Sequence, residues 1–206
     1  MSNTIITIAR SYGSGGRTIG KELAGLRGVP YYDRNIIYLA SDKSGVDPKV
    51  FSENDEFVKP KFIDRVAAMG KKMIPPETRK FSSRENIFKY QSTVIKDLAA
   101  RGDCVVIGRC ANYTLKDTGH KLIKVFIWAP KDHCIRNVME KLSISESEAE
   151  KTINDINRHR REYYKFYTGK DWESALNYDL CINSAQYDKE TAVRLISSYA
   201  DIVSSL

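Results

Sequence analysis

No apolar run in this 206-residue sequence approaches the roughly 20 residues that a membrane-spanning helix requires. The start of the chain also lacks the basic segment, apolar stretch and small-residue cleavage site of a secretory signal. We therefore expect a cytoplasmic protein rather than a membrane or secreted one. With 42% hydrophobic and 29% charged residues, the chain has an ordinary globular composition and is long enough for one substantial core.

Spaced metal ligands are lacking too, although the chain has 4 cysteines and 3 histidines. No CxxC, HxxxH or HExxH motif occurs, which argues against a zinc site. Disulfides are not expected in a cytoplasmic protein. Cys104 and Cys181 lie in apolar, strand-like runs, so we expect both thiols to be buried and structural.

Positive charge is in excess, with a formal net charge of +7. Such an excess fits either a polyanionic partner such as RNA or a pocket that holds phosphates. No tract of five or more Lys/Arg residues is present, which argues against nucleic acid as the partner.

Short apolar runs alternate with helical patterns along the chain. Strands are expected at residues 5–9, 29–33, 104–108, 122–128 and 179–183. Helices are expected at residues 18–26, 34–41, 87–102, 130–141, from 145 onward, and 191–202. This alternation predicts an α/β fold of three layers, with a five-stranded parallel sheet between helices on both faces. In such folds, ligands bind at the carboxyl ends of the strands.

We expect a single domain over residues 1–206. Residues from about 47 to 80 differ in composition from the rest of the chain, because lysines, prolines and acids alternate with isolated apolar residues. The pair Asp47-Pro48 is typical of a helix start, and we predict a mostly helical insertion here. Two further segments, Ser82–Glu85 and Ser145–Glu148, match the capping-box pattern.

A glycine-rich segment follows the first predicted strand and opens the first predicted helix. Glycines there let backbone N–H groups converge on an anion, and the helix N-terminus adds positive potential. We therefore expect a loop that binds the phosphates of a nucleotide such as ATP, formed by Gly13, Ser14, Gly15, Gly16, Arg17 and Thr18. The Thr18 hydroxyl would contact Mg²⁺. A flexible glycine turn is the alternative.

On the GxxxxGK[ST] template, this loop has Ser11 in place of the first glycine and Arg17 in place of the lysine. Residues 6–24 also resemble the opening of bacterial cytidylate kinases, nucleoside-monophosphate kinases with the P-loop fold. Aligned without gaps, the positions that coincide are Gly13, Ser14, Gly15, Thr18, Leu23 and Ala24. In that register Gly16, not Arg17, falls on the phosphate-binding lysine, so two registers remain open. The loop followed by Tyr-Asp-Arg resembles a divergent branch, the cytidylate kinase-like proteins.

The resemblance implies acceptor-binding residues at Asp33, Arg34 and Arg109. Residues 31–38 lie where the family has its second strand and first monophosphate contacts. Gly108 and Arg109 match the family's Asp-Gly-Arg-Asp, whereas both acidic positions differ. Arg34 and Arg109 would bind the acceptor phosphate, and Asp33 would supply the carboxylate. The alternatives are a helix N-cap for Asp33 and a strand-end salt bridge for Arg109.

The resemblance also implies an arginine-rich lid at about residues 143–170. Arg158 and Arg161 are three residues apart, hence on one helix face. Together with Arg17, they would be catalytic and would stabilise charge on the transferred phosphoryl group. Arg160 would contact the cofactor. An exposed basic helix face is the alternative. Beyond the last predicted strand, Ser184 is expected near the adenine.

Together with the resemblance, these residues predict transfer of the γ-phosphate of ATP, with Mg²⁺, to a nucleoside monophosphate. CMP and dCMP are the acceptors that the resemblance favours. The changed acceptor residues Arg34, Leu39 and Cys110 keep open a kinase of the same fold with another small acceptor. The missing lysine and carboxylates keep open a nucleotide- or nucleic-acid-binding protein with little or no turnover.

Overall fold

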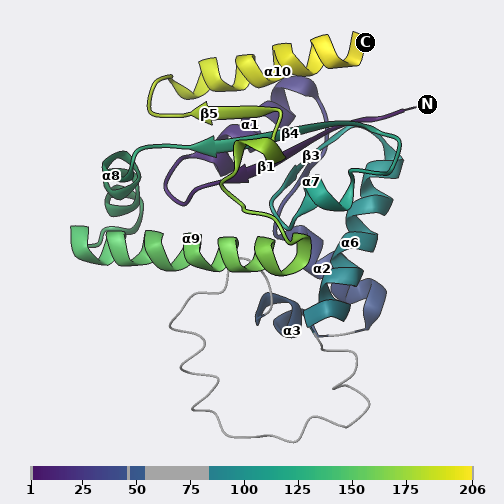
Figure 1. Cartoon of the computed structure of the whole chain (residues 1–206), viewed down its shortest axis with the longest axis horizontal. Coiled ribbons are helices and arrows are strands. Elements are labelled where there is room, and N and C mark those ends of the chain that lie inside the picture. The colour runs from purple at the N-terminus through teal and green to yellow at the C-terminus, as the bar shows by residue number, and fades with distance from the viewer. Residues whose placement is uncertain (1, 46, 54–83, 206) are drawn as a thin grey trace, which may run out of the picture.

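The computed structural model describes residues 2–45, 47–53 and 84–205. Within these ranges, five strands form one parallel sheet in the order β2-β3-β1-β4-β5 (Figure 1). The strands are β1 (Thr4–Arg10), β2 (Tyr31–Tyr32), β3 (Cys104–Ile107), β4 (Lys121–Trp128) and β5 (Leu180–Asn183). The predicted parallel sheet and all five strands are confirmed.

Helices connect the strands and cover the sheet. They are α1 (Gly16–Arg27), α2 (Asn35–Ser44), α3 (Pro48–Glu53), α6 (Arg84–Arg101), α7 (Ala111–Thr114), α8 (Lys131–Leu142), α9 (Glu146–Thr168) and α10 (Lys189–Ser205), with a 3-10 turn at Ala175–Asn177. The short helix α7 was not predicted. Helix α3 begins at Pro48, and Asp47 Oδ1 accepts a hydrogen bond from the Lys49 N–H at 2.7 Å, as the Asp47-Pro48 pair predicts.

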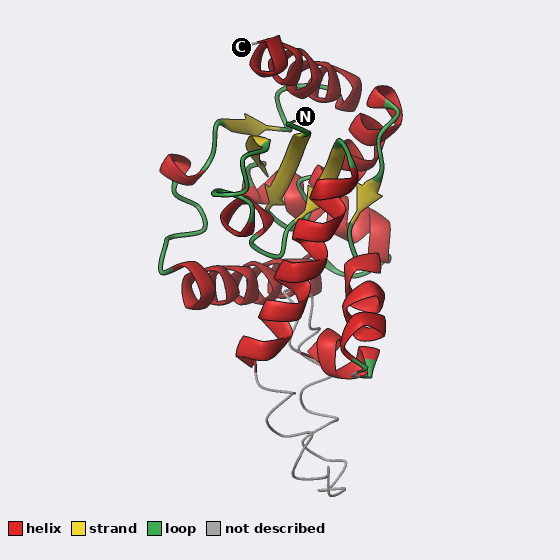
Figure 2. Ribbon diagram, turned by 90° about the vertical axis from the view of Figure 1, so that its right-hand side faces the viewer, coloured by secondary structure: helices red, strands yellow, loops and turns green. Residues whose placement is uncertain are grey.

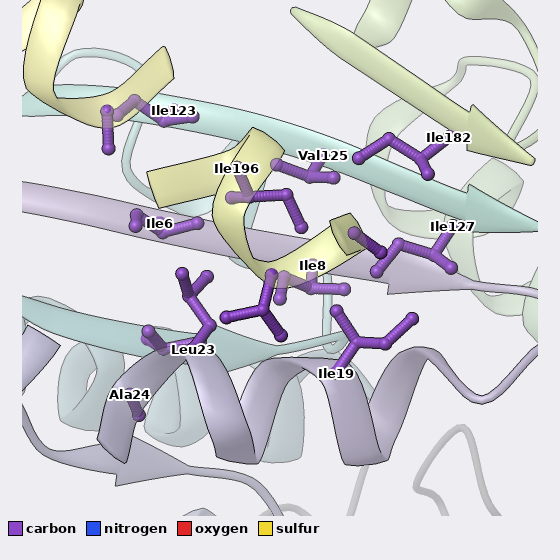
Figure 3. Packing of buried hydrophobic residues seen from close by; sticks show 14 of the residues in the cluster. Ile6, Ile8, Ile19, Leu23, Ala24, Ile123, Val125, Ile127, Ile182 and Ile196 are labelled. Atoms are coloured by element: carbon purple, nitrogen blue, oxygen red, sulfur yellow. The ribbon is translucent and has the colours of Figure 1, made fainter. Parts of the chain in front are cut away.

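The apolar residues of the central strands are buried on both faces of the sheet, which explains why the strands read as continuous apolar runs. On one face, α1 and α10 pack over alternate residues of β1 and β4 (Figure 3). On the other face, α2, α6 and α7 cover β1 and β3. Helix α9 lies on the opposite side of the sheet from α10, and Figure 2 shows the helices on both sides of the strands. The three-layer architecture is therefore confirmed.

The capping box at the start of α9 is confirmed, because Ser145 Oγ accepts from the Glu148 N–H and the Glu148 carboxylate accepts from the Ser145 N–H. At its other end α9 stops at Gly169, whose φ of 70° is left-handed. The second predicted capping box, at residues 82–85, and most of the predicted insertion lie outside the described residues. None of the described helices combines the length and apolarity that a membrane span requires.

One predicted burial is wrong. Cys104 is buried in β3, as expected, but Cys181 is exposed. The reason is the position of β5 at the edge of the sheet. Its neighbour Ile182 faces the core that α1 and α10 cover, so Cys181 points to the opposite face, where the edge strand is only partly covered.

Candidate active site

The loop between β1 and α1 lies at the carboxyl end of the central strand, and its conformation requires glycine. Gly13 and Gly15 have φ values of 87° and 75°, in the left-handed region. A Cβ at Gly13 would lie 2.7 Å from the Cys134 carbonyl oxygen, and one at Gly16 would lie 2.6 Å from Cβ of Arg10. The loop is thus a tightly packed turn and not a flexible connection.

Four backbone N–H groups of this loop are available to a ligand. In the part of the chain that the structure describes, no acceptor is found for the N–H groups of Gly13, Gly15, Gly16 and Arg17. Gly16 and Arg17 are the first two residues of α1, where N–H groups have no partner within the helix and the helix dipole is positive. Such an arrangement attracts and orients an anion such as phosphate.

Two side chains from the middle of α9 form hydrogen bonds with the backbone at the start of this loop. Asn157 Oδ1 accepts a hydrogen bond from the Tyr12 N–H at 2.8 Å, and a guanidinium nitrogen of Arg160 donates to the Arg10 carbonyl at 2.8 Å. The Arg160 guanidinium also lies 5.8 Å from the centre of the Tyr12 ring, within cation–π range. Arg160 is only 3% exposed, so its contacts with the loop are made in the interior.

Asp33, at the end of β2, lies between two arginines. Its Oδ2 forms an ion pair with Nε of Arg17, and its Oδ1 lies 3.6 Å from a guanidinium nitrogen of Arg109. The Tyr31 hydroxyl is 3.3 Å from the same Asp33 Oδ2 and 3.3 Å from the Arg17 carbonyl. Burial, and next the negative charge of Asp33, raise the pKa of Tyr31. Tyr31 therefore stays protonated and can donate its hydrogen bond.

The structure bears on the alternatives that the sequence left open for Asp33 and Arg109. Arg34, not Asp33, occupies the N-cap position of α2, and the Asp33 carboxylate faces the arginines instead. Arg109 does face a carboxylate, but it is fully buried, and its φ of 53° is left-handed, as is that of Cys110. Non-glycine residues rarely adopt this conformation and are concentrated at functional sites.

The structure brings only some of the predicted site residues together. Arg17, Asp33 and Arg109 meet, and Arg160 reaches the loop backbone. Thr18 and Arg34 are exposed at the starts of α1 and α2.

Two of the three arginines predicted to be catalytic, Arg158 and Arg161, lie on α9 and pair with acids. Arg158 contacts Asp155 at 2.8 Å, and Arg161 contacts Glu173 at 3.0 Å. The part of the predicted lid from Glu146 to Thr168 is one continuous helix.

Three side chains from outside the loop bind it, and two of them were not predicted. Asn157 and Asn137 were not predicted to have any role, and Ser184 was expected near an adenine. Asn137 donates to the Gly13 carbonyl at 2.8 Å, and Ser184 Oγ donates to the Ser14 carbonyl at 2.7 Å. These partners lie 124 and 170 positions apart in the sequence, so no local pattern could reveal them.

A parallel sheet in the order β2-β3-β1-β4-β5, with a glycine loop between β1 and α1, is the arrangement found in the P-loop kinases. Two solved structures share this fold: shikimate kinase from Bacteroides thetaiotaomicron (TM-score 0.54, 13% identity, 97% of this chain and 99% of that chain) and a gluconokinase from Sinorhizobium meliloti (TM-score 0.52, 12% identity, 98% and 95%).

The sequence model of the cytidylate kinase-like family matches residues 5–186, and the chain belongs to that family. An uncharacterized protein from Eubacterium ventriosum is 26% identical, with a TM-score of 0.70 over 96% of this chain and 98% of that chain. No curated protein matches the sequence. The resemblance to cytidylate kinase-like proteins is thus confirmed.

Proposed function

We propose that this chain transfers the γ-phosphate of ATP to a nucleoside monophosphate, with CMP or dCMP as the first acceptors to test. The observation that carries the proposal is the loop before α1, where the N–H groups of Gly13, Gly15, Gly16 and Arg17 have no acceptor among the described residues. Membership of the cytidylate kinase-like family supports the choice of acceptor.

On the donor side, the four N–H groups would hold phosphate oxygens of ATP, and Arg17 would add a charged contact. Among the described residues, no group of three His, Cys, Asp or Glu side chains could hold a metal. The Thr18 hydroxyl, exposed in the first turn of α1, fits a Mg²⁺ ion that is held mainly by phosphate oxygens. Mg²⁺ bound with the nucleotide would neutralise part of its negative charge.

On the acceptor side, the exposed Arg34 would bind the monophosphate directly, and Asp33 would hold Arg109 and Arg17 in place. Arg109 is fully buried, so it would bind the monophosphate only after a rearrangement that exposes it. No general base is required, because a phosphate oxygen of the acceptor is already nucleophilic. Catalysis would then consist of positioning the two substrates and stabilising charge on the transferred group. Arg158 and Arg161 would assist only after the phosphates displaced their present partners, Asp155 and Glu173.

A kinase with a different small acceptor is the second candidate. The observation in its favour is the full burial of Arg109 beside Asp33, since the carboxylate offsets part of the positive charge that a monophosphate would use. The same fold also serves shikimate kinase and gluconokinase, so shikimate and gluconate belong among the acceptors to be tested.

The test is a turnover screen with ATP and Mg²⁺ against CMP, dCMP, UMP, AMP, shikimate, gluconate and common small alcohols. Phosphorylation of CMP or dCMP is the expected result. Phosphorylation of a different compound would support the second candidate instead. Tight ATP binding without any transfer would indicate a nucleotide-binding protein, and a chain that binds no nucleotide would refute the proposal.

A further inference from the structure

Two consecutive carbonyl groups of the phosphate loop are held by side chains from outside it. Asn137, on α8, donates from Nδ2 to the Gly13 carbonyl at 2.8 Å. Ser184, directly after β5, donates from Oγ to the Ser14 carbonyl at 2.7 Å. The two donors approach the loop from different elements, and both bonds join segments far apart in the sequence.

These bonds set the direction of two N–H groups of the loop, those of Ser14 and Gly15. No cis peptide occurs in the described chain, and in a trans peptide the C=O and the following N–H point in opposite directions. With the Ser14 carbonyl held by Ser184, the Gly15 N–H must point away from Ser184. With the Gly13 carbonyl held by Asn137, the Ser14 N–H turns back toward the Ser11 carbonyl, 3.4 Å away. The Gly15 N–H is one of the four that have no acceptor among the described residues.

The loop needs such support because glycine has more backbone freedom than any other residue. Without contacts from outside the loop, Gly13, Gly15 and Gly16 could adopt many conformations, and an anion that had to order them would bind less tightly. Ser184 is itself well anchored, since its N–H donates to the Trp128 carbonyl at 2.8 Å at the end of β4. The Ser184 bond therefore connects the loop to the sheet, and the Asn137 bond connects it to α8.

We infer that Asn137 and Ser184 are positioning residues of the phosphate loop: Ser184 directs the Gly15 N–H toward a phosphate ligand, and Asn137 stabilises the turn that carries it. This inference rests on the phosphate-binding part of the proposed function, but not on the acceptor or on turnover. It also gives Ser184 a role different from the adenine contact that the sequence suggested.

The test compares Ser184→Ala, Ser184→Thr and Asn137→Ala with the wild type in the full chain. The probes are inorganic pyrophosphate and ATP with Mg²⁺, titrated by calorimetry, with melting temperatures measured in parallel. Loss of one hydrogen bond should raise the dissociation constant of both probes about tenfold in Ser184→Ala and in Asn137→Ala. Ser184→Thr keeps the hydroxyl and should bind nearly as the wild type does. Where turnover is found, KM for ATP should rise more than kcat falls.

Ser147→Ala is the matched control, because Ser147 is exposed on α9 and its side chain has no hydrogen bond with any other described residue. If Ser184→Ala and Asn137→Ala bind pyrophosphate as tightly as Ser147→Ala, the inference is overturned, even if the enzyme transfers phosphate. A wild type that binds no pyrophosphate overturns it as well. If the wild type binds pyrophosphate, the alanine variants bind it weakly and no acceptor is phosphorylated, the inference stands and the proposed function fails.

Discussion

Arg17 and Asp33 form an ion pair that joins the start of α1 to the end of β2. The same carboxylate lies 3.6 Å from Arg109, at the end of β3. Asp33 therefore contacts one arginine beside the phosphate loop and one on the predicted acceptor side. A phosphate that binds Arg17 must compete with Asp33 for its guanidinium group. Phosphate binding in the loop is therefore expected to change the contacts of the buried Asp33 carboxylate.

Replacement of Arg17 by alanine is expected to weaken ATP binding by about 10- to 100-fold, the effect of losing one charge-assisted hydrogen bond. Arg17→Lys keeps the charge and should lose less affinity. Titration calorimetry with ATP and Mg²⁺ would measure both. Unchanged affinity in Arg17→Ala would mean that Gly16 occupies the lysine position and that Arg17 serves only Asp33.

Asp33→Asn is expected to destabilise the protein by about 3 kcal/mol, because it removes the negative charge beside the fully buried Arg109. Denaturant unfolding would measure this loss. Asp201→Asn, which removes an exposed partner of Arg27, is the control and should cost under about 1 kcal/mol. Equal losses in the two variants would show that the buried pair contributes no more than a surface pair.

Two glycines of α1 offer a matched pair of substitutions. Gly16→Ala places a methyl group 2.6 Å from Cβ of Arg10 and should distort the loop, lowering both stability and ATP affinity. Gly25→Ala, in the same helix, meets nothing within 4 Å and should stabilise the protein by about 0.5–1 kcal/mol. Thermal unfolding and ATP titration would separate the two. A Gly16→Ala protein that binds ATP normally would be incompatible with the tight packing of the loop.

The four cysteines are expected to react at different rates with an alkylating reagent at pH 8. Cys181 is exposed and should be labelled first, whereas Cys104, Cys110 and Cys134 are buried and should react only on unfolding. Mass spectrometry after brief labelling would identify the modified thiol. Rapid labelling of Cys104 in the native protein would contradict the packing of β3.

Stability should fall at high pH because of Cys104. Burial, and next the nearby charge of Asp103, raise the pKa of this thiol from 9.0 to about 12. The folded protein holds the neutral thiol, so this contribution to stability is complete below pH 9 and is lost as pH rises toward 12. Denaturant unfolding between pH 8 and pH 11 should show a steeper decline in the wild type than in Cys104→Ala. Parallel declines would mean that the thiol titrates alike in both states.

The sequence predicted the sheet, the glycine loop and the capping box at Ser145 correctly, because each depends on local residue patterns. Alternating apolar runs and glycine spacing are visible within a few positions of the chain. The contacts of the site were much less predictable. Asn157 binds Tyr12 across 145 positions, and Arg160 binds the Arg10 carbonyl across 150. Such pairs are set by the packing of α9 on the sheet.

The exposure of Cys181 has a similar cause. An apolar strand is the same in sequence whether it lies at the centre or at the edge of a sheet, and only the strand order distinguishes the two. The arginines of α9 show that residues close in sequence can have different environments. Arg158, Arg160 and Arg161 formed one predicted patch, but helical geometry turns Arg160 into the interior while the other two pair with acids.

The central claim is that the loop before α1 binds the phosphates of a nucleotide through its backbone. The most direct measurement follows the backbone amide resonances of the ¹⁵N-labelled protein during a titration with ATP and Mg²⁺. The largest shifts are expected at the N–H groups of Gly13, Gly15, Gly16 and Arg17, with saturation at a single affinity. Saturable ATP binding that leaves these four amides unmoved, or no binding at millimolar ATP, would contradict it.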